Sequence, residues 1–222
     1  MKKKKKSPMR RKTKAIIGII ICLALAAANI ALSGYTWTKE AALKEMMEYN
    51  ATGELDIVSP LPSLGLKNKA NYQFYLMENE YCFAMFSINH HLWHGWLDGP
   101  CLIAEKDSSQ AVQLRYNSFS SSRDIDKDML RIFGIIRDDE IERLEIEIQI
   151  AGFGEVSTLE KLTLQSESFI EYGGDRYVNI DHLFVYGLND YLQTPFAVRG
   201  YNASGEQIYY GDLQLGQSTF LG

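Results

Sequence analysis

Alternation of apolar and polar residues is the dominant pattern in the second half of the chain. Over residues 143–150 every second residue is leucine or isoleucine, and the residues between them are charged or amide side chains. A period of two puts successive side chains on opposite faces of a strand, so this stretch predicts a half-buried strand. Apolar and β-branched runs predict further strands at residues 73–77, 81–88, 101–105, 111–116, 130–136, 158–164, 182–186 and 196–201.

The segment 196–210 has the pattern of a β-hairpin. Two aromatic and β-branched runs flank the loop Asn202-Ala-Ser-Gly205, whose composition is typical of a tight turn. Short strands with few long helical patterns between them favour antiparallel pairing over a parallel βαβ sheet. We therefore expect residues 72–222 to form a mainly β domain, either an antiparallel β-sandwich or an open barrel.

The N-terminal region has a different pattern. Residues 15–33 are 19 uncharged, mostly apolar residues, close to the number that crosses a bilayer as a helix. Residues 1–14 contain nine Lys or Arg and no acid, which favours a cytoplasmic position for this tail. The sequence thus predicts a single-pass signal-anchor in the cell membrane, with everything after it extracytoplasmic. The basic residues expected to contact anionic lipid are Lys2, Lys3, Lys4, Lys5, Lys6, Arg10 and Arg11.

A cleaved signal peptide is the alternative to a retained anchor. Ala31 and Ser33 put small residues at the two positions that signal peptidase reads, and cleavage there would secrete the domain. The apolar run is longer than the usual signal-peptide core, which favours the anchor.

Residues 34–71 are expected to connect the span to the domain. Helix-forming residues follow Thr38, a suitable N-cap, and predict a short juxtamembrane helix over residues 38–48. Residues 51–71 contain Pro60, Pro62 and two glycines, a composition typical of a stalk or loop. The expected organisation is a tail (1–14), a span (15–33), a helix with stalk (34–71) and the β domain (72–222).

Charge divides the chain more sharply than the net value of −5 indicates. The tail carries nine of the 23 basic residues, which leaves 14 basic against 28 acidic residues in the remainder. A domain this acidic is a poor candidate for binding nucleic acid, because phosphate binding depends on Lys and Arg.

One cluster combines several residue types that can carry chemistry. Three of the four histidines lie between residues 90 and 94, beside two tryptophans and an acid. Imidazole and carboxylate groups are metal ligands, so one hypothesis is a metal site of His90, His94 and Asp98. A second hypothesis is an aromatic ligand patch of His91, Trp93 and Trp96, and a third is a structural hairpin tip.

No nucleophile elbow, zinc-protease, nucleotide-binding or Cys-x-x-Cys motif is present in the sequence, and we predict no cofactor and no enzymatic activity. Cys82 and Cys101 lie in apolar runs, and a disulfide between them is allowed if the compartment is oxidising.

Residues 133–146, with the run Gly-Ile-Ile-Arg-Asp-Asp-Glu-Ile, and residues 198–209, with Gly-Tyr-Asn-Ala-Ser-Gly-Glu-Gln-Ile-Tyr, resemble uncharacterised membrane-anchored or secreted proteins of Gram-positive bacteria. The resemblance implies an extracytoplasmic β-rich domain and no particular activity. Asn202 stands where those proteins more often have Asp.

Together these features predict a membrane-tethered β domain that acts as a non-enzymatic binding, sensing or accessory module of the cell envelope. Its partner would be another envelope protein. The alternatives are an envelope enzyme or metal-dependent protein that uses His90, His91, His94 and Asp98, and a structural subunit of a membrane complex.

Overall fold

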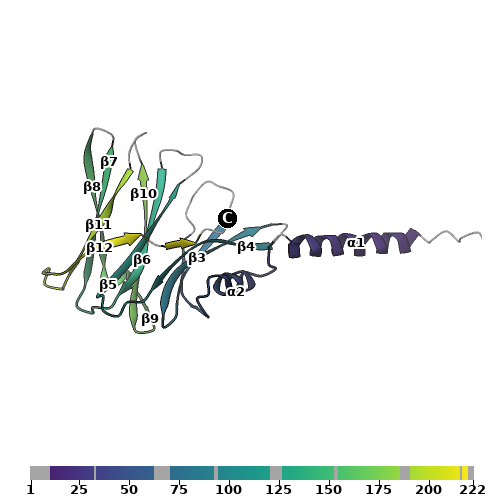
Figure 1. The fold of residues 1–222 in the computed structure, drawn as a ribbon, viewed down its shortest axis with the longest axis horizontal. Helices are drawn as coiled ribbons and strands as arrows, with labels where there is room; N and C mark the ends of the chain where they lie inside the picture. Colours follow the sequence, from purple (N-terminus) through teal and green to yellow (C-terminus); the bar gives the residue numbers. More distant parts are fainter. Residues whose placement is uncertain are drawn as a thin grey trace, which may run out of the picture.

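The computed structural model describes residues 11–32, 34–62, 71–92, 95–120, 127–152, 155–185, 191–215 and 217–219. These residues form two α-helices, a short 3-10 helix and thirteen strands (Figure 1). The helices are α1 (Arg11–Leu32), α2 (Lys39–Tyr49) and the 3-10 helix η1 (Ser166–Ser168). The strands are β1 (Asp56–Leu61), β2 (Asn71–Glu78), β3 (Cys82–His91), β4 (Gly95–Glu105), β5 (Val112–Ser120), β6 (Lys127–Ile136), β7 (Arg143–Gly152), β8 (Glu155–Gln165), β9 (Ile170–Tyr172), β10 (Asp175–Val185), β11 (Tyr191–Tyr201), β12 (Gln207–Leu215) and β13 (Gln217–Thr219).

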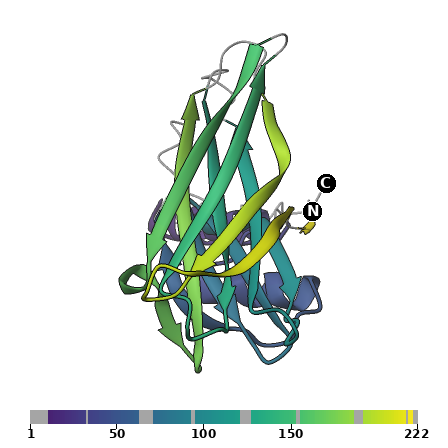
Figure 2. The ribbon, with the colours of Figure 1, turned by 90° about the vertical axis from the view of Figure 1, so that its left-hand side faces the viewer.

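The strands form two sheets, which confirms the expectation of a mainly β, sandwich-like domain. One sheet has the order β1-β2-β3-β4-β13, and the other has the order β8-β7-β11-β12-β5-β6-β10-β9. The described pairings are antiparallel except for a short parallel contact between β12 and β5. Figure 2, viewed from the end opposite α1, has the green and yellow strands in front and the blue elements, including α2, behind.

Strand β3 is buried on both faces, which explains its continuous apolar run. Residues 82–89 are all buried. Phe86 and its alternate neighbours pack against α2, whereas Phe83 and Met85 pack against Phe133 of the second sheet. A strand covered on both sides has no polar face, so its sequence does not alternate.

Strand β6 of the second sheet is also buried on both faces. Leu130 and Ile132 belong to the core enclosed by that sheet, and Phe133 and Ile135 face the first sheet. The core of the second sheet collects inward-facing residues from β5, β6, β7, β10, β11 and β12. This sheet therefore curls around its own core.

The predicted strand over residues 143–150 is confirmed as β7. Leu144, Ile146 and Ile148 are completely buried, while the charged residues between them are partly exposed. The predicted hairpin is confirmed as β11 and β12. In its turn, Asn202 Oδ1 accepts hydrogen bonds from the backbone N–H groups of Ser204 and Glu206.

Helix α2 confirms the short helix predicted over residues 38–48. The Thr38 hydroxyl accepts a hydrogen bond from the Ala41 backbone N–H at 3.1 Å, the expected N-cap. The buried residues Leu43 and Met46 pack on the face of the first sheet that includes Phe86. The apolar stripe of this helix is therefore used within the domain.

The predicted stalk is wrong in part, because residues 56–61 form β1. This strand pairs with β2 and buries Leu61 in the core between the sheets. Pro60 lies within it, which is compatible with an edge strand because one side of such a strand needs no N–H donors. The prolines and glycines of this segment predicted a loop, but residues 56–61 form a strand because they pair with β2.

Helix α1 extends away from the β domain (Figure 1). Its large apolar residues are exposed, from 39 % for Ile17 to 89 % for Leu32. Among the helices of the described residues, none combines the length and hydropathy that crossing a membrane requires. The tail residues 1–10, including the lysines expected to contact lipid, lie outside the described residues.

Candidate functional site

The β3–β4 hairpin carries most of the residues for which the sequence predicted a function. In its register, His91 lies opposite Gly95, His90 opposite Trp96, and Ile88 opposite Asp98. Trp93 and His94, at the tip, lie outside the described residues. The hairpin thus brings His90, Trp96 and Asp98 onto neighbouring positions of two strands.

The side chains of the hairpin contact rings and amides. The His90 ring lies 4.6 Å from the Trp96 ring between centroids. His91 Nε2 is 3.2 Å from Asn89 Nδ2. Burial raises the pKa of Asp98. No group of three or more His, Cys, Asp or Glu side chains in the described part of the chain is arranged to hold a metal ion. The metal site of His90, His94 and Asp98 stays a prediction.

The hairpin is tied to the segment that follows α1. Thr36 and Trp96 exchange two backbone hydrogen bonds, of 2.7 and 2.8 Å. Gly95 makes this approach feasible: its φ is +99°, and a Cβ there would lie 2.3 Å from the Thr36 carbonyl oxygen. Tyr35 adds an edge-to-face contact with His91, at 5.3 Å between ring centroids.

We call residues 34–37, 90–92 and 95–97 the aromatic base of the domain. Trp37 is 70 % exposed and Leu92 is 80 % exposed. Trp37 follows α1 by five residues, Leu92 adjoins His91, which contacts Tyr35, and Leu32 at the end of α1 is also exposed. Two segments about 60 residues apart in sequence therefore form one surface at the end of the apolar helix.

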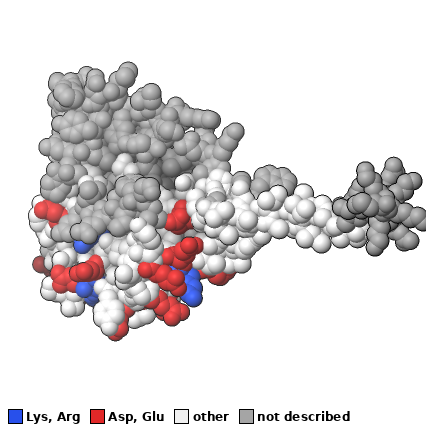
Figure 3. Space-filling model, turned by 45° about the vertical axis from the view of Figure 1, so that its right-hand side comes forward, with Lys and Arg blue, Asp and Glu red and all other residues white. Residues whose placement is uncertain are grey.

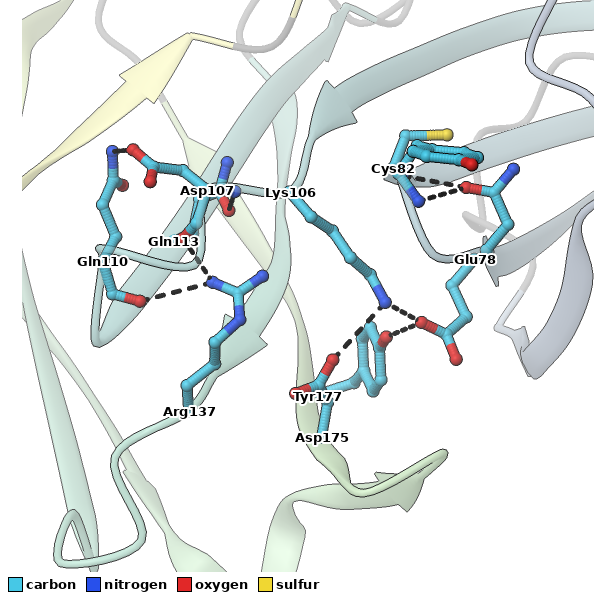
Figure 4. Close-up of polar contacts among 11 residues, drawn as sticks. Glu78, Cys82, Lys106, Asp107, Gln110, Gln113, Arg137, Asp175 and Tyr177 are labelled. Atoms are coloured by element: carbon cyan, nitrogen blue, oxygen red, sulfur yellow. Dashed lines mark hydrogen bonds and ion pairs between the residues drawn. The ribbon is translucent and has the colours of Figure 1, made fainter.

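A second cluster of polar groups lies at the edge of the core between the two sheets (Figure 4). The Glu78 carboxylate of β2 accepts hydrogen bonds from the Lys106 ammonium and the Tyr177 hydroxyl. Lys106 Nζ also lies 3.4 Å from Asp175 Oδ2. Burial, followed by the hydrogen bond to Glu78, raises the pKa of Tyr177. The phenol therefore stays protonated as a donor, and the cluster links β2, β10 and the end of β4.

The most deeply buried charge is Arg131 of β6, whose side chain has no exposed area. Its guanidinium contacts the Asp181 carboxylate through two hydrogen bonds, of 2.5 and 2.7 Å, and donates to the Pro62 carbonyl at 2.7 Å. It also lies 4.5 Å from the centre of the Phe74 ring. These contacts join the two sheets, as buried ion pairs with full hydrogen bonding do.

The second sheet curls but does not close into a barrel, because the described strands β8 and β10 are not paired with each other. Strand β8 is the edge strand at one end of its order, and β10 is covered by β9 only at residues 175–177. A groove of about 680 Å³ separates the two strands, lined by residues 161–165 and 179–181. His182 Nε2 and Glu160 Oε2, 2.7 Å apart, bridge it at one end. Asn179 is among the lining residues, and its Oδ1 atom is buried and accepts no hydrogen bond from the described residues.

The candidate disulfide between Cys82 and Cys101 is a wrong prediction. Both cysteines are buried, neither is in a disulfide, and the Cys101 thiol lies 3.5 Å from Asn50 Oδ1. Cys82 lies opposite Glu105 and Cys101 opposite Phe86, so the two are four residues out of register, about 13 Å along the strands. A disulfide needs Cα atoms within about 7 Å. Burial also raises the pKa of the Cys82 thiol, which makes it a weak nucleophile.

No protein-family model, no curated protein and no solved structure matches the chain. The resemblance to membrane-anchored or secreted Gram-positive proteins therefore stays a hypothesis.

The reasoning from sequence did not single out Glu78, Tyr177 or the groove between β8 and β10. A signal existed for Arg131, which interrupts the apolar run of β6. No sequence pattern indicates the groove, because its presence depends on how closely the curled sheet brings β8 to β10.

Proposed function

We propose that this protein is a non-enzymatic, membrane-tethered module of the cell envelope that binds an extended segment of another envelope protein. The observation that carries the tether is the exposure of apolar side chains along α1 outside the β domain. Isoleucine and leucine in this number are stabilised by removal from water. These side chains lie on the uncharged part of α1, so a lipid bilayer is the environment that would remove them from water.

We propose that α1 spans the membrane although it does not reach the length and hydropathy that a span usually requires. Without its first four residues, the helix has 18 uncharged residues, which extend about 27 Å. The hydrocarbon core of a bilayer is about 30 Å thick. A span a few ångströms short is accommodated by local thinning and by flanking Lys and Arg side chains that reach the headgroups. The basic residues before Ala15 could reach the headgroups in this way, and we propose that they contact anionic lipid.

The tether is tested with a C-terminally tagged chain in intact cells and isolated membranes. We expect a full-length chain in the membrane fraction, with a tag that protease removes from outside. A chain shortened up to the small residues at 31–33 and recovered from the medium would favour the secreted alternative. A tag that is protected in intact cells but digested after lysis would contradict the proposed orientation.

The binding role rests on the groove between β8 and β10. Its two walls are strand edges whose outward backbone groups have no ladder partner among the described residues. An extended peptide supplies the matching N–H and C=O groups, the mode of recognition known as strand addition. One inserted strand needs about 10 Å between its neighbours, twice the usual strand spacing. His182 and Glu160 meet through their side-chain ends, which keeps the two backbones apart.

Asn179, which lines the groove, is the acceptor that we propose for an inserted strand. Its buried Oδ1 accepts no hydrogen bond from the described residues, and an unsatisfied buried carbonyl costs about 1–3 kcal/mol. A backbone N–H donated by an inserted strand would remove that cost. The buried charged groups Arg131 and Glu78 are engaged in contacts between the sheets. Because these groups are already paired with protein side chains, we favour binding over catalysis.

The groove is tested by photo-crosslinking in the native envelope. A photoreactive residue replaces Thr163 of β8 in one variant and Ile180 of β10 in another, both of which line the groove, and Tyr210, exposed on β12, is the control position. We expect crosslinks from both groove positions to reach one segment of one partner. Crosslinks that are equally frequent from position 210, or that reach unrelated segments, would refute strand addition.

A further inference from the structure

The aromatic base differs in charge from the rest of the domain. Residues 34–38 and 89–97 contain no Asp, Glu, Lys or Arg, although the chain after residue 14 has twice as many acidic as basic residues. Figure 3 shows Asp and Glu in red on the body of the domain, whereas the described part of α1 is white. The base itself therefore carries no carboxylate that would repel anionic headgroups.

The composition of the base matches the interface between water and hydrocarbon. All three tryptophans of the chain lie in these two segments, at positions 37, 93 and 96. Tryptophan and tyrosine concentrate at the headgroup level because the ring is apolar and its N–H or O–H is polar. Trp37 and Leu92 are largely exposed, whereas leucines of the β strands such as Leu76 and Leu102 are buried. A lipid surface would cover both.

The attachment to α1 fixes where this surface lies. Thr36 follows the last residue of α1 by only four positions, and its two hydrogen bonds to Trp96 hold the β3–β4 hairpin beside the end of the helix. If α1 crosses the bilayer, the base cannot be more than a few residues from the headgroups.

We propose that the aromatic base rests in the headgroup layer of the outer leaflet and holds the β domain against the membrane. This inference rests on the tether proposed above. It assigns Trp37 and Leu92 to direct lipid contact, and it assigns Gly95 the role of keeping the hairpin beside the helix end. Strands β8 and β10, which border the groove, then lie away from the lipid, since both are distant from α1 in Figure 1.

Depth-dependent quenching of tryptophan fluorescence tests the placement. The full-length Trp93→Phe/Trp96→Phe variant keeps Trp37 as the single reporter. It is reconstituted in vesicles of equal parts phosphatidylglycerol and phosphatidylcholine, with nitroxide-labelled lipid bearing the label either near the headgroup or at the tail end. The control carries Tyr210→Trp in the background of Trp37→Phe/Trp93→Phe/Trp96→Phe, which moves the single reporter to the exposed surface of β12.

We expect the headgroup-proximal label to quench Trp37 at least twofold more than the tail-end label, and the control reporter to respond to neither. Quenching of Trp37 no greater than that of the control, in a chain that floats with the vesicles, would overturn the placement while the tether stands. Stronger quenching by the tail-end label would put Trp37 in the hydrocarbon and also overturn it. A chain that does not float with the vesicles would refute the tether and the placement together.

A second variant tests the contact in a folded protein. Trp37→Glu/Leu92→Glu puts two carboxylates on the base, and both positions are exposed, so the fold should be retained. We expect protease cleavage near residues 33–38 to become at least several-fold faster in vesicles but to stay unchanged in detergent. Equal acceleration in both media would mean that the substitutions loosen the chain itself, and it would refute the lipid contact.

Discussion

Removing Asp181 should destabilise the domain more than removing the whole Arg131–Asp181 pair. Asp181→Ala leaves the guanidinium of a completely buried arginine without its counter-ion, and such a loss costs about 3–5 kcal/mol. The Asp181 side chain is 21 % exposed, so in Asp181→Ala water can partly solvate the guanidinium. We therefore expect the free energy of unfolding to fall by about 3 kcal/mol. The hydrogen bond to the Pro62 carbonyl stays in this variant.

The double variant Arg131→Met/Asp181→Leu removes both charges and keeps an apolar volume. It loses the donor to the Pro62 carbonyl, worth about 1 kcal/mol, and the contact of the guanidinium with Phe74. We expect a loss of about 1–2 kcal/mol, smaller than that of the single variant. The comparison separates the cost of an unpaired buried charge from the contribution of the pair.

The assay is urea unfolding of the full-length protein in detergent, followed by near-ultraviolet circular dichroism, together with a thermal melt. For a domain of this size each kcal/mol shifts Tm by about 2–4 °C, so Asp181→Ala should lower Tm by about 6–12 °C. Glu48→Ala is the control, because its ion pair with Lys44 is exposed on α2 and should contribute little. A double variant as unstable as Asp181→Ala, or Asp181→Ala as stable as the control, would refute the reasoning.

Three further predictions concern titration and thiols. The hydrogen bond from Arg199 lowers the pKa of Glu147, so its contribution to stability is present above about pH 4.3 and is lost as the pH falls through the folded-state pKa. The stability difference between wild type and Glu147→Gln should therefore shrink in acid, and a difference constant between about pH 3 and 7 would contradict this. Burial raises the pKa of Tyr177, so the wild type should lose stability above about pH 10, where the unfolded phenol ionises first. Tyr177→Phe should lose less, and identical alkaline unfolding profiles would contradict the assignment. Cys82 and Cys101 should react with an alkylating reagent only after unfolding, both as free thiols by mass spectrometry, and a mass two hydrogens lower without reductant would contradict the fold.

The strands were predictable where one face of a strand is buried and the other is solvated. Over residues 143–150 the alternation specified both the strand and its buried face, because a period of two leaves only one way to hide the isoleucines. The hairpin at Asn202 was also predictable, since its turn depends on local hydrogen bonds of a single side chain.

Predictions failed where the outcome depends on distant segments. Residues 56–61 resemble a loop by composition, yet they form β1 because β2 presents an edge to pair with. Cys82 and Cys101 are close enough in sequence for a disulfide, but the register of β3 and β4 separates them. Local composition carries no information about register, which the packing of both faces decides.

The candidate sites divide in the same way. From the sequence alone one can infer an apolar helix next to a strand-rich acidic domain, and aromatic residues near position 93 with no charged residue among them. Periodicity, composition and charge are properties of neighbouring residues, so they can be read without a fold. Three features required the folded structure: the hydrogen bonds between Thr36 and Trp96, the contact of Glu78 with Tyr177, and the opening of the second sheet between β8 and β10. Those contacts connect residues far apart in the chain, and they exist because curled sheets bury their apolar faces against each other.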